Sequence, residues 1–262
     1  MQKLRISVLN DNTAGRWCRA EHGLSFLIEA DQTVLFDTSS TDLIAFNAQV
    51  LGIDFRQIKT IVLSHGHDDH TGGLMLFEGQ QLICHPDTFL KRYRKSNETE
   101  LGIKWTKEEV SARFRLQTSK EPVKLSEQIY FLCEIPRLTN FESRETAFKN
   151  ADGSDDFVRD DSGLAVITSK GLVVVSGCAH SGICNMVAHA IKVTGIEKVH
   201  LVIGGFHLQN DDVVTQTTIE WLKSMHVEQV VPSHCTAFAA QAAIYKSYRF
   251  LPVKSGNRIE IA

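Results

Sequence analysis

The densest group of reactive side chains lies within residues 64–73, whose sequence is SHGHDDHTGG. Four of these side chains can bind a metal ion: His65, His67, Asp69 and His70. In extended backbone, side chains two residues apart project to the same side, so His65 and His67 can bind one ion. The chain then turns, and Asp69 with His70 can face a second ion. A solvated polar turn is the alternative, but chance clustering of three histidines and an aspartate after an apolar strand is improbable.

The types of these side chains indicate which metals they prefer. Imidazole combined with carboxylate suits zinc, and also iron or manganese. We therefore expect two divalent metal ions as cofactors, with Zn²⁺ favoured and Mn²⁺ or Fe²⁺ as alternatives.

The first half of the chain must contain the strands that hold this group of side chains in place. Alternating and continuous apolar runs predict the strands, and apolar residues at helical spacing predict the helices. The expected elements are strands at 4–8, 25–29, 33–37 and 60–64, a helix at 43–50 that ends at Gly52, and a helix that begins near Thr71.

The second half repeats the pattern of a strand followed by a polar loop. The expected elements are strands at 164–168, 172–175, 199–203 and 229–233, a helix from Ser181 as N-cap to Gly195, and a helix from about Asp212. Three of these strands are followed by loops that hold histidine or cysteine: Cys178 and His180, then His207, then His234. Rigid strands that end in loops are a common way to position reactive groups.

Composition narrows the class of protein. The chain has 262 residues, of which 43% are hydrophobic and 23% charged, as in an ordinary globular protein. The net charge of -3 gives no basic field for nucleic acid, and no apolar run reaches the roughly 18 residues that span a membrane. The six cysteines form no CxxC pair, and the N-terminus shows no signal-peptide pattern. We therefore expect a cytoplasmic protein with free thiols that binds neither nucleic acid nor membrane.

The motif HxHxDH after an apolar strand, followed by Thr-Gly-Gly, resembles the signature of the metallo-β-lactamase superfamily. Further segments resemble one branch of it, the 7,8-dihydropterin-6-methyl-4-(β-D-ribofuranosyl)aminobenzene 5′-phosphate synthases. These segments are 20–25 (AEHGLS), 35–38 (LFDT), 176–183 (SGCAHSGI), 204–208 (GGFHL) and 233–236 (SHCT).

The resemblance implies an α/β fold, an αββα metallo-β-lactamase sandwich with a two-metal site along one edge of its sheets. We expect a single domain over residues 1–262. The region at about 86–160 is more charged and less periodic than the rest, so it is expected to be an inserted cap or lid.

The resemblance also implies further metal ligands. His234 fits the final histidine, which binds the second metal ion. Cys178 stands where many relatives have a bridging aspartate, and a thiolate can bind or bridge zinc, although a buried inert thiol is the alternative. His180 is the candidate for the third histidine of the first metal ion, or else a hydrogen-bonding partner of a ligand or substrate.

Other polar residues are expected to support catalysis. Asp161 aligns with the usual third-histidine segment and is expected to be a ligand or proton carrier, with a turn-capping role as the alternative. His207 is expected to bind substrate or act as a general acid, and a structural histidine is its alternative. His22 is expected to reach the substrate from the first hairpin, and Asp37 to orient the metal loop. Asp69, His207 and Asp161 are the predicted catalytic residues.

Two features of the predicted insert indicate an anionic substrate. Residues 91–95 (KRYRK) form a short basic run, although a solvated helix face is the alternative for Lys91 and Lys95. Arg137 lies in a segment that resembles the same branch, and its guanidinium suits bidentate binding of phosphate. The expected partner is therefore a phosphorylated or pterin-like small molecule.

These residues predict a metal-dependent hydrolase. A bound metal ion lowers the pKa of its water from about 15.7 to about 7, so a metal-activated hydroxide could cleave a phosphoester or related bond. The resemblance implies an alternative, a transferase that displaces pyrophosphate from a dihydropterin diphosphate by a ribofuranosyl-aminobenzene phosphate. A non-catalytic metal- or ligand-binding sensor is a third possibility, because Cys178 at the bridging position could weaken catalysis.

Overall fold

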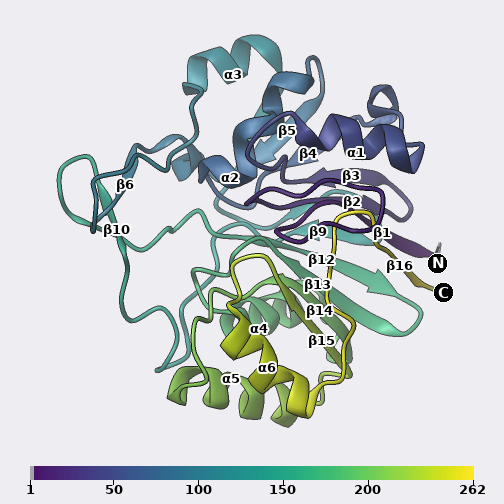
Figure 1. Cartoon of the computed structure of the whole chain (residues 1–262), viewed down its shortest axis with the longest axis vertical. Helices are drawn as coiled ribbons and strands as arrows, with labels where there is room; N and C mark the ends of the chain where they lie inside the picture. Colours follow the sequence, from purple (N-terminus) through teal and green to yellow (C-terminus); the bar gives the residue numbers. More distant parts are fainter. Residues whose placement is uncertain (1–2) are drawn as a thin grey trace.

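The computed structural model describes residues 3–262, which form two β-sheets packed face to face, with helices on both outer surfaces (Figure 1). Within that range, the first sheet has seven strands in the order β16-β1-β2-β3-β4-β5-β7. They are β1 Leu4–Asn10, β2 Ser25–Glu29, β3 Thr33–Phe36, β4 Thr60–Val62, β5 Gln81–Cys84, β7 Arg115–Thr118 and β16 Arg258–Ile261. Since β3 and β4 are parallel, the residues that follow them lie at the same edge of the sheet.

The second sheet supplies the other side of that edge. Its six strands, counted over the described residues, run in the order β15-β14-β13-β12-β9-β8. They are β8 Val123–Lys124, β9 Ile129–Phe131, β12 Gly163–Thr168, β13 Gly171–Ser176, β14 Val199–Gly205 and β15 Gln229–Ser233. Strands β13, β14 and β15 are parallel, so the loops that follow all three meet at one edge.

Alternation of side chains along the strands fills the space between the sheets. Ile6 and Val8 of β1 face this core, as do Leu164 and Val166 of β12. Ala165, between the last two, instead packs toward the helices that cover the second sheet. This period of two is the physical basis of the apolar patterns in the sequence.

Helices complete the two outer layers. The first sheet is flanked by α1 Leu43–Leu51, α2 Asp68–Thr71 and α3 Lys107–Arg113, and the second by α4 Ile183–Thr194, α5 Val213–Ser224 and α6 Phe238–Ser247 (Figure 1). A separate apolar cluster lies beneath each helical layer. The predicted α/β class and αββα sandwich are therefore confirmed. No helix within residues 3–262 has the length and apolar character needed to cross a membrane.

Helix ends agree with the sequence in some places and differ in others. Gly52 and Gly195 end α1 and α4 with φ of 70°, a left-handed conformation that costs glycine least. The helix expected to begin near Thr71 starts at Asp68 and continues as the 3₁₀ helix η2, Gly72–Leu76.

The start of α4 is a correction to the predicted N-cap at Ser181. The helix begins after Gly182, and the Ser181 amide and hydroxyl both donate to the carboxylate of Asp161. The carboxylate of Glu142 instead accepts hydrogen bonds from two amides of the first helical turn. The helix is therefore capped from a distant segment, which local sequence signals do not reveal.

The segment expected to be an insert, residues 86–160, is divided between the sandwich and a small outer sheet. Its helix α3 and strands β7, β8 and β9 belong to the layers described above. Strands β6 Arg92–Arg94, β10 Phe148–Asn150 and β11 Asp155–Asp156 form a separate three-stranded sheet beside the sandwich (Figure 1). The part outside the sandwich is shorter than expected, because β7 pairs with the first sheet, and β8 and β9 belong to the second.

Phe131 on β9 tests the core between the sheets. Its side chain is fully buried, so Phe131→Ala should lower the free energy of unfolding by about 3–5 kcal/mol through lost contacts and a cavity. Urea unfolding followed by circular dichroism measures this change. The control Phe238→Ala, at a residue 86% exposed, should stay within about 0.5 kcal/mol of the parent. Equal losses in both variants would contradict the assigned core.

Candidate metal centre

The loop after β4 brings two imidazoles together. His65 Nε2 lies 3.0 Å from His67 Nδ1, and both side chains are buried. Gly66 between them allows this geometry, because a Cβ there would lie 2.0 Å from the carbonyl oxygen of Thr88. The close packing of Thr88 against the loop therefore requires glycine at this position.

The buried carboxylate of Asp37 organises the loop from the end of β3. It accepts hydrogen bonds from the Ser64 amide at 2.7 Å, the Ser64 hydroxyl at 2.7 Å and His70 Nδ1 at 2.7 Å. The Ser64 oxygen in turn lies 2.8 Å from His65 Nδ1. With Nδ1 as the donor in His65 and in His70, the Nε2 lone pairs of these two rings are free to bind a cation. Asp37 thus has the orienting role that the sequence predicts.

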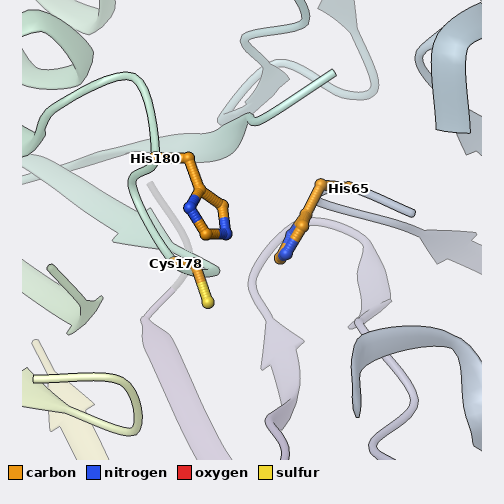
Figure 2. Close-up of side chains that lie close together, drawn as sticks. All are labelled: His65, Cys178 and His180. Carbon is orange, nitrogen blue, oxygen red and sulfur yellow. The ribbon is translucent and has the colours of Figure 1, made fainter. Parts of the chain in front are cut away.

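The loop after β13 approaches from the second sheet. Gly177 permits the approach, since a Cβ there would lie 2.1 Å from the Ser64 hydroxyl oxygen. Cys178 Sγ consequently lies 3.3 Å from His70 Nε2. Figure 2 shows Cys178 and His180 on this loop facing His65 across a common space.

His234 comes from the end of β15 and joins the other side of the group. Its Nε2 lies 3.1 Å from His70 Nε2 and 3.4 Å from Asp69 Oδ2. Its Nδ1 lies 3.0 Å from the side-chain oxygen of Asn12, which fixes the ring with Nε2 toward the cavity. Asp69 also accepts from His22 Nε2 at 3.1 Å, so His22 closes the outer side.

The donor atoms form three overlapping groups within residues 3–262, and the members of each lie within 4.8 Å of one another. The groups are His65 with Cys178 and His180, His70 with Cys178 and His234, and His22 with Asp69 and His234. Cys178 belongs to the first two groups, so its sulfur lies between two places where an ion could be held.

The donors fit metal ions in both distance and chemistry. Two ligands of a tetrahedral zinc ion with bonds of about 2.0–2.1 Å lie roughly 3.3 Å apart, close to the nitrogen separations of 3.0 and 3.1 Å observed here. In addition, His180 Nε2 is buried without a hydrogen-bond partner. Buried polar atoms are rarely left unsatisfied, and a bound cation would satisfy atoms of this kind.

Burial keeps most of the imidazoles neutral. It lowers the pKa values of His65, His67 and His180 well below the usual 6.5, and neighbouring histidines add to the effect. Burial likewise lowers the pKa of His234 to about 4, against the attraction of Asp69. At neutral pH these rings therefore offer lone pairs rather than positive charge.

His70 and Asp69 behave in the opposite way. Burial opposes the charge of His70, but the carboxylates of Asp69 and Asp37 outweigh it and raise the pKa of His70 to about 9. Burial also opposes ionisation of Asp69, yet its histidine neighbours hold the pKa of that carboxyl well below the usual range. Burial raises the pKa of the Cys178 thiol far above its usual value. Without a metal ion, His70 and Cys178 therefore hold protons.

A cavity of about 360 Å³ gives access to these donors. His22, Asp69 and His207 line it together with Arg94. His207 follows β14 with φ of 51°, and its ring centre lies 4.4 Å from that of His180. Burial and the nearby Arg94 guanidinium lower the pKa of His207, so the ring is neutral near pH 7 and suits hydrogen bonding to a substrate.

Two of the residues predicted for the site lie away from this cavity. Asp161 is fully buried, and its carboxylate accepts from the Ser181 amide at 3.0 Å, which holds the loop of Cys178 and His180 from behind. Arg137 donates to the Ser143 hydroxyl and to the carbonyl oxygen of Phe157. Neither residue lines the cavity, and the hydrogen bonds of both are to neighbouring protein groups.

The basic side chains of residues 91–95 differ in burial. Arg92 is fully buried, and its guanidinium pairs with Asp160 at 2.9 Å and with Asp156 at 3.3 Å. Asp160 also accepts from the Gly66 amide at 2.7 Å, so this arginine holds the metal-binding loop through one carboxylate. The sequence pattern did not reveal this buried pair, because charge alone does not indicate burial.

Comparisons with known proteins agree with this geometry. The family model described as the metallo-β-lactamase superfamily matches residues 19–82. The 7,8-dihydropterin-6-methyl-4-(β-D-ribofuranosyl)-aminobenzene-5′-phosphate synthase of Methanocaldococcus jannaschii is 36% identical in an alignment of 279 positions, gaps included, that covers 95% of this chain and 93% of the relative. The uncharacterised protein MJ0448 of the same organism is 34% identical, over 98% of this chain and 100% of its own length.

Solved structures give the same result. The crystal structure of Tm1679, a metal-dependent hydrolase of the β-lactamase superfamily, matches with a TM-score of 0.85 and 28% identity over 99% of both chains. Zn²⁺-bound PqqB from Methylobacterium extorquens, 13% identical with a TM-score of 0.58 over 98% of this chain and 100% of its own, shares the fold. The chain belongs to the metallo-β-lactamase superfamily, in the branch of the M. jannaschii synthase.

Cobalt substitution tests whether the sulfur of Cys178 binds metal. We expect the Co²⁺-loaded protein to show a near-ultraviolet thiolate-to-cobalt charge-transfer band, because this sulfur belongs to two donor groups. The band should disappear in Cys178→Ala and persist in Cys84→Ala, which alters another buried thiol. A band of full intensity in Cys178→Ala would rule out this sulfur as a ligand.

Metal affinity should depend on pH, because metal binding displaces protons. His70, with a pKa of about 9, is protonated at pH 7, and the proton competes with the metal ion for Nε2. Zn²⁺ affinity of the metal-free protein should therefore rise with pH up to about 9, where the competition by His70 ends. Titration calorimetry in buffers of different ionisation enthalpy measures the protons released, and an affinity constant across this window would contradict the interpretation.

Proposed function

We propose that the protein is a hydrolase that holds two divalent metal ions, Zn²⁺ first and Mn²⁺ or Fe²⁺ as alternatives, and cleaves a phosphoester or related bond of a phosphorylated small molecule. The observation that carries the proposal is the sharing of Cys178 between two groups of buried imidazoles. Two neighbouring cation positions are the arrangement that a two-metal displacement requires.

Each proposed ion has its own histidines. In this proposal His65, His67 and His180 hold the first ion, and Asp69, His70 and His234 hold the second, with Cys178 beside both. The close nitrogen pairs support the division, since His65 lies beside His67 whereas His70 lies beside His234.

The surrounding side chains suit the same chemistry. When bound, two divalent ions supply a nucleophile at neutral pH and stabilise the attacking and leaving oxygens of a phosphoryl group. Asp69 lines the cavity as a carboxylate, which can hold a reacting water through hydrogen bonds. His207 and His22 also line it and can bind the substrate, while Asp161 keeps the ligand loop in place.

A transferase is the second candidate, because a specific observation favours it. The relative that is 36% identical over 95% of this chain is a pterin-related phosphate synthase. The same donors would serve either reaction, since cations that stabilise an oxyanion also stabilise a phosphate leaving group. We place the hydrolase before the transferase because Tm1679, 28% identical over 99% of both chains, is a metal-dependent hydrolase.

Product analysis separates these candidates. The metal-loaded protein is incubated with phosphomonoesters, phosphodiesters and lactones, and separately with a dihydropterin diphosphate plus a ribofuranosyl-aminobenzene phosphate. Release of phosphate or alcohol from a phosphoester, or opening of a lactone to its hydroxy acid, supports the hydrolase, and a coupled pterin product found by mass spectrometry supports the transferase. Ligand binding without turnover of any compound would instead favour a sensor.

Removing one ligand should abolish turnover without unfolding the chain. We expect His67→Ala to lose bound metal and at least about 100-fold in kcat/KM, while its melting temperature stays near that of the metal-free parent. Plasma emission spectrometry measures the metal content. The control His226→Ala changes an exposed histidine that precedes the start of β15, whereas His234 follows its end. This variant should keep both metal and activity. Full turnover by a metal-free His67→Ala would falsify the proposal.

A further inference from the structure

Two adjacent buried carboxylates contact the two loops that carry the donors of the first proposed ion. Asp160 and Asp161 lie just before β12, and both are fully buried. Asp160 Oδ2 accepts a hydrogen bond from the Gly66 amide at 2.7 Å. Asp161 Oδ2 accepts from the Ser181 amide at 3.0 Å and also from the Ser181 hydroxyl. We call Asp160 and Asp161 the aspartate pair.

The two contacts lie next to the three histidines proposed for the first ion. Gly66 stands between His65 and His67, and Ser181 directly follows His180. His65 and His180 face each other from the two loops (Figure 2). Adjacent Cα atoms are about 3.8 Å apart, so a single peptide unit joins the two carboxylates that hold these loops. The aspartate pair therefore fixes how far one loop lies from the other.

The aspartate pair is itself held in place by buried contacts. Asp160 Oδ1 accepts from the Arg92 guanidinium at 2.9 Å, and the same guanidinium lies 3.3 Å from Asp156 Oδ2. Arg137 donates to the carbonyl oxygen of Phe157, in the segment that leads to the pair. These contacts make the pair a fixed support, and they give both arginines a structural reason to be present.

Other groups hold the histidines of the second ion. Asp37 accepts from His70 Nδ1 at 2.7 Å, at the end of β3. The side-chain oxygen of Asn12 lies 3.0 Å from His234 Nδ1. Neither contact involves the aspartate pair, so a change in the pair leaves both histidines supported.

Cys178, which both ion positions share, is also held independently of the pair. Its carbonyl oxygen accepts from Cys235 Sγ at 3.5 Å. The preceding residue, Gly177, accepts from the Gly205 amide at 3.0 Å. The strand ends of the second sheet therefore hold the sulfur, whereas the pair holds the part of the loop next to His180.

We propose that Asp160 and Asp161 are positioning residues that set the metal affinity of the first ion position alone, by fixing the spacing of its histidines through hydrogen bonds to the two loops. The inference rests on the proposed function, because it uses the two ion positions. It adds the residues that make one position depend on the contact between the two sheets.

Variants that retain one ion separate the two positions. His234→Ala removes a donor of the second position, and His180→Ala removes a donor of the first. Zn²⁺ affinity is measured in both backgrounds by competition with a chromophoric chelator. Asp161→Ala should weaken Zn²⁺ binding about tenfold or more in the His234→Ala background, and by less than about twofold in the His180→Ala background.

Asp161→Asn distinguishes a positioning role from a role of the charge. Both Ser181 donors share one oxygen of Asp161, so the single amide oxygen of asparagine can accept from both. In the His234→Ala background this variant should stay within about threefold of the Zn²⁺ affinity of Asp161, below the loss that removing such a support causes. A loss as large as that of Asp161→Ala would overturn the positioning role, because the carboxylate charge would then be what matters.

Asp160 is tested against Asp156, since both pair with Arg92 and only Asp160 reaches Gly66. Asp160 uses one oxygen for each partner, so the single amide oxygen of Asp160→Asn cannot serve both. This variant should weaken Zn²⁺ binding about fivefold or more in the His234→Ala background. Asp156→Asn should lower the melting temperature of the metal-free protein as well but leave Zn²⁺ affinity unchanged. Equal weakening by both variants would point to general loss of packing and contradict the proposal.

The remaining outcomes separate this inference from the proposed function. Unchanged Zn²⁺ affinity in Asp161→Ala, or no Zn²⁺ binding by His234→Ala itself, would overturn the inference. The proposed function is judged instead on the parent protein, by its ion content from plasma emission spectrometry and by its turnover. A parent with two ions, no turnover and the expected affinity losses would keep the aspartate pair and refute the hydrolase.

Discussion

The rest of the site depends on lone pairs of buried imidazoles that face one another and require a positive charge between them. His65 Nε2 and His67 Nδ1, 3.0 Å apart, repel when both are unprotonated, and burial disfavours protonation of His65, His67 and His180. Near His70, the carboxylates of Asp37 and Asp69 supply the field that keeps a proton in place. The two halves of the centre thus differ: one offers neutral donors to a cation, and the other exchanges a proton for it.

Parallel strands make this convergence possible. The ends of β3 and β4 in one sheet meet the ends of β13, β14 and β15 in the other, so residues more than a hundred positions apart become neighbours. Gly177 permits the loop after β13 to approach Ser64 of the first sheet, and Gly66 permits Thr88 to pack against the histidine loop, because a side chain at either position would collide. The small outer sheet then contributes to both support and access: Arg92 holds the metal loop through Asp160, whereas Arg94 on the same strand lines the cavity.

The sequence predicted those features of the fold and the site that depend on residues close together in the chain. The strands and helices followed from apolar periodicity, and the histidine motif from four donors placed directly after one strand, whereas the sandwich was implied by the resemblance to the superfamily. Asn12, Asp160 and Phe148 could not be found in this way, because each reaches the site from a different element and none has a local motif. The basic run 91–95 and Arg137 indicated charge, but their burial and partners depend on tertiary packing.

A thiol shared by two metal ions, as proposed for Cys178, would affect the choice of both metal and substrate. A thiolate is softer than the aspartate of many relatives, so it favours zinc or iron over magnesium. A thiolate carries the same single negative charge as an aspartate carboxylate, however, so the exchange leaves the net charge of the ligand set unchanged. If the two divalent cations of the proposal are bound, the charges of Asp69 and a Cys178 thiolate would neutralise only part of the positive charge, because the imidazole donors are neutral. The remaining positive charge would attract an anion into a cavity that Arg94 also lines, so the proposed centre suits an anionic substrate whether the bond is hydrolysed or transferred.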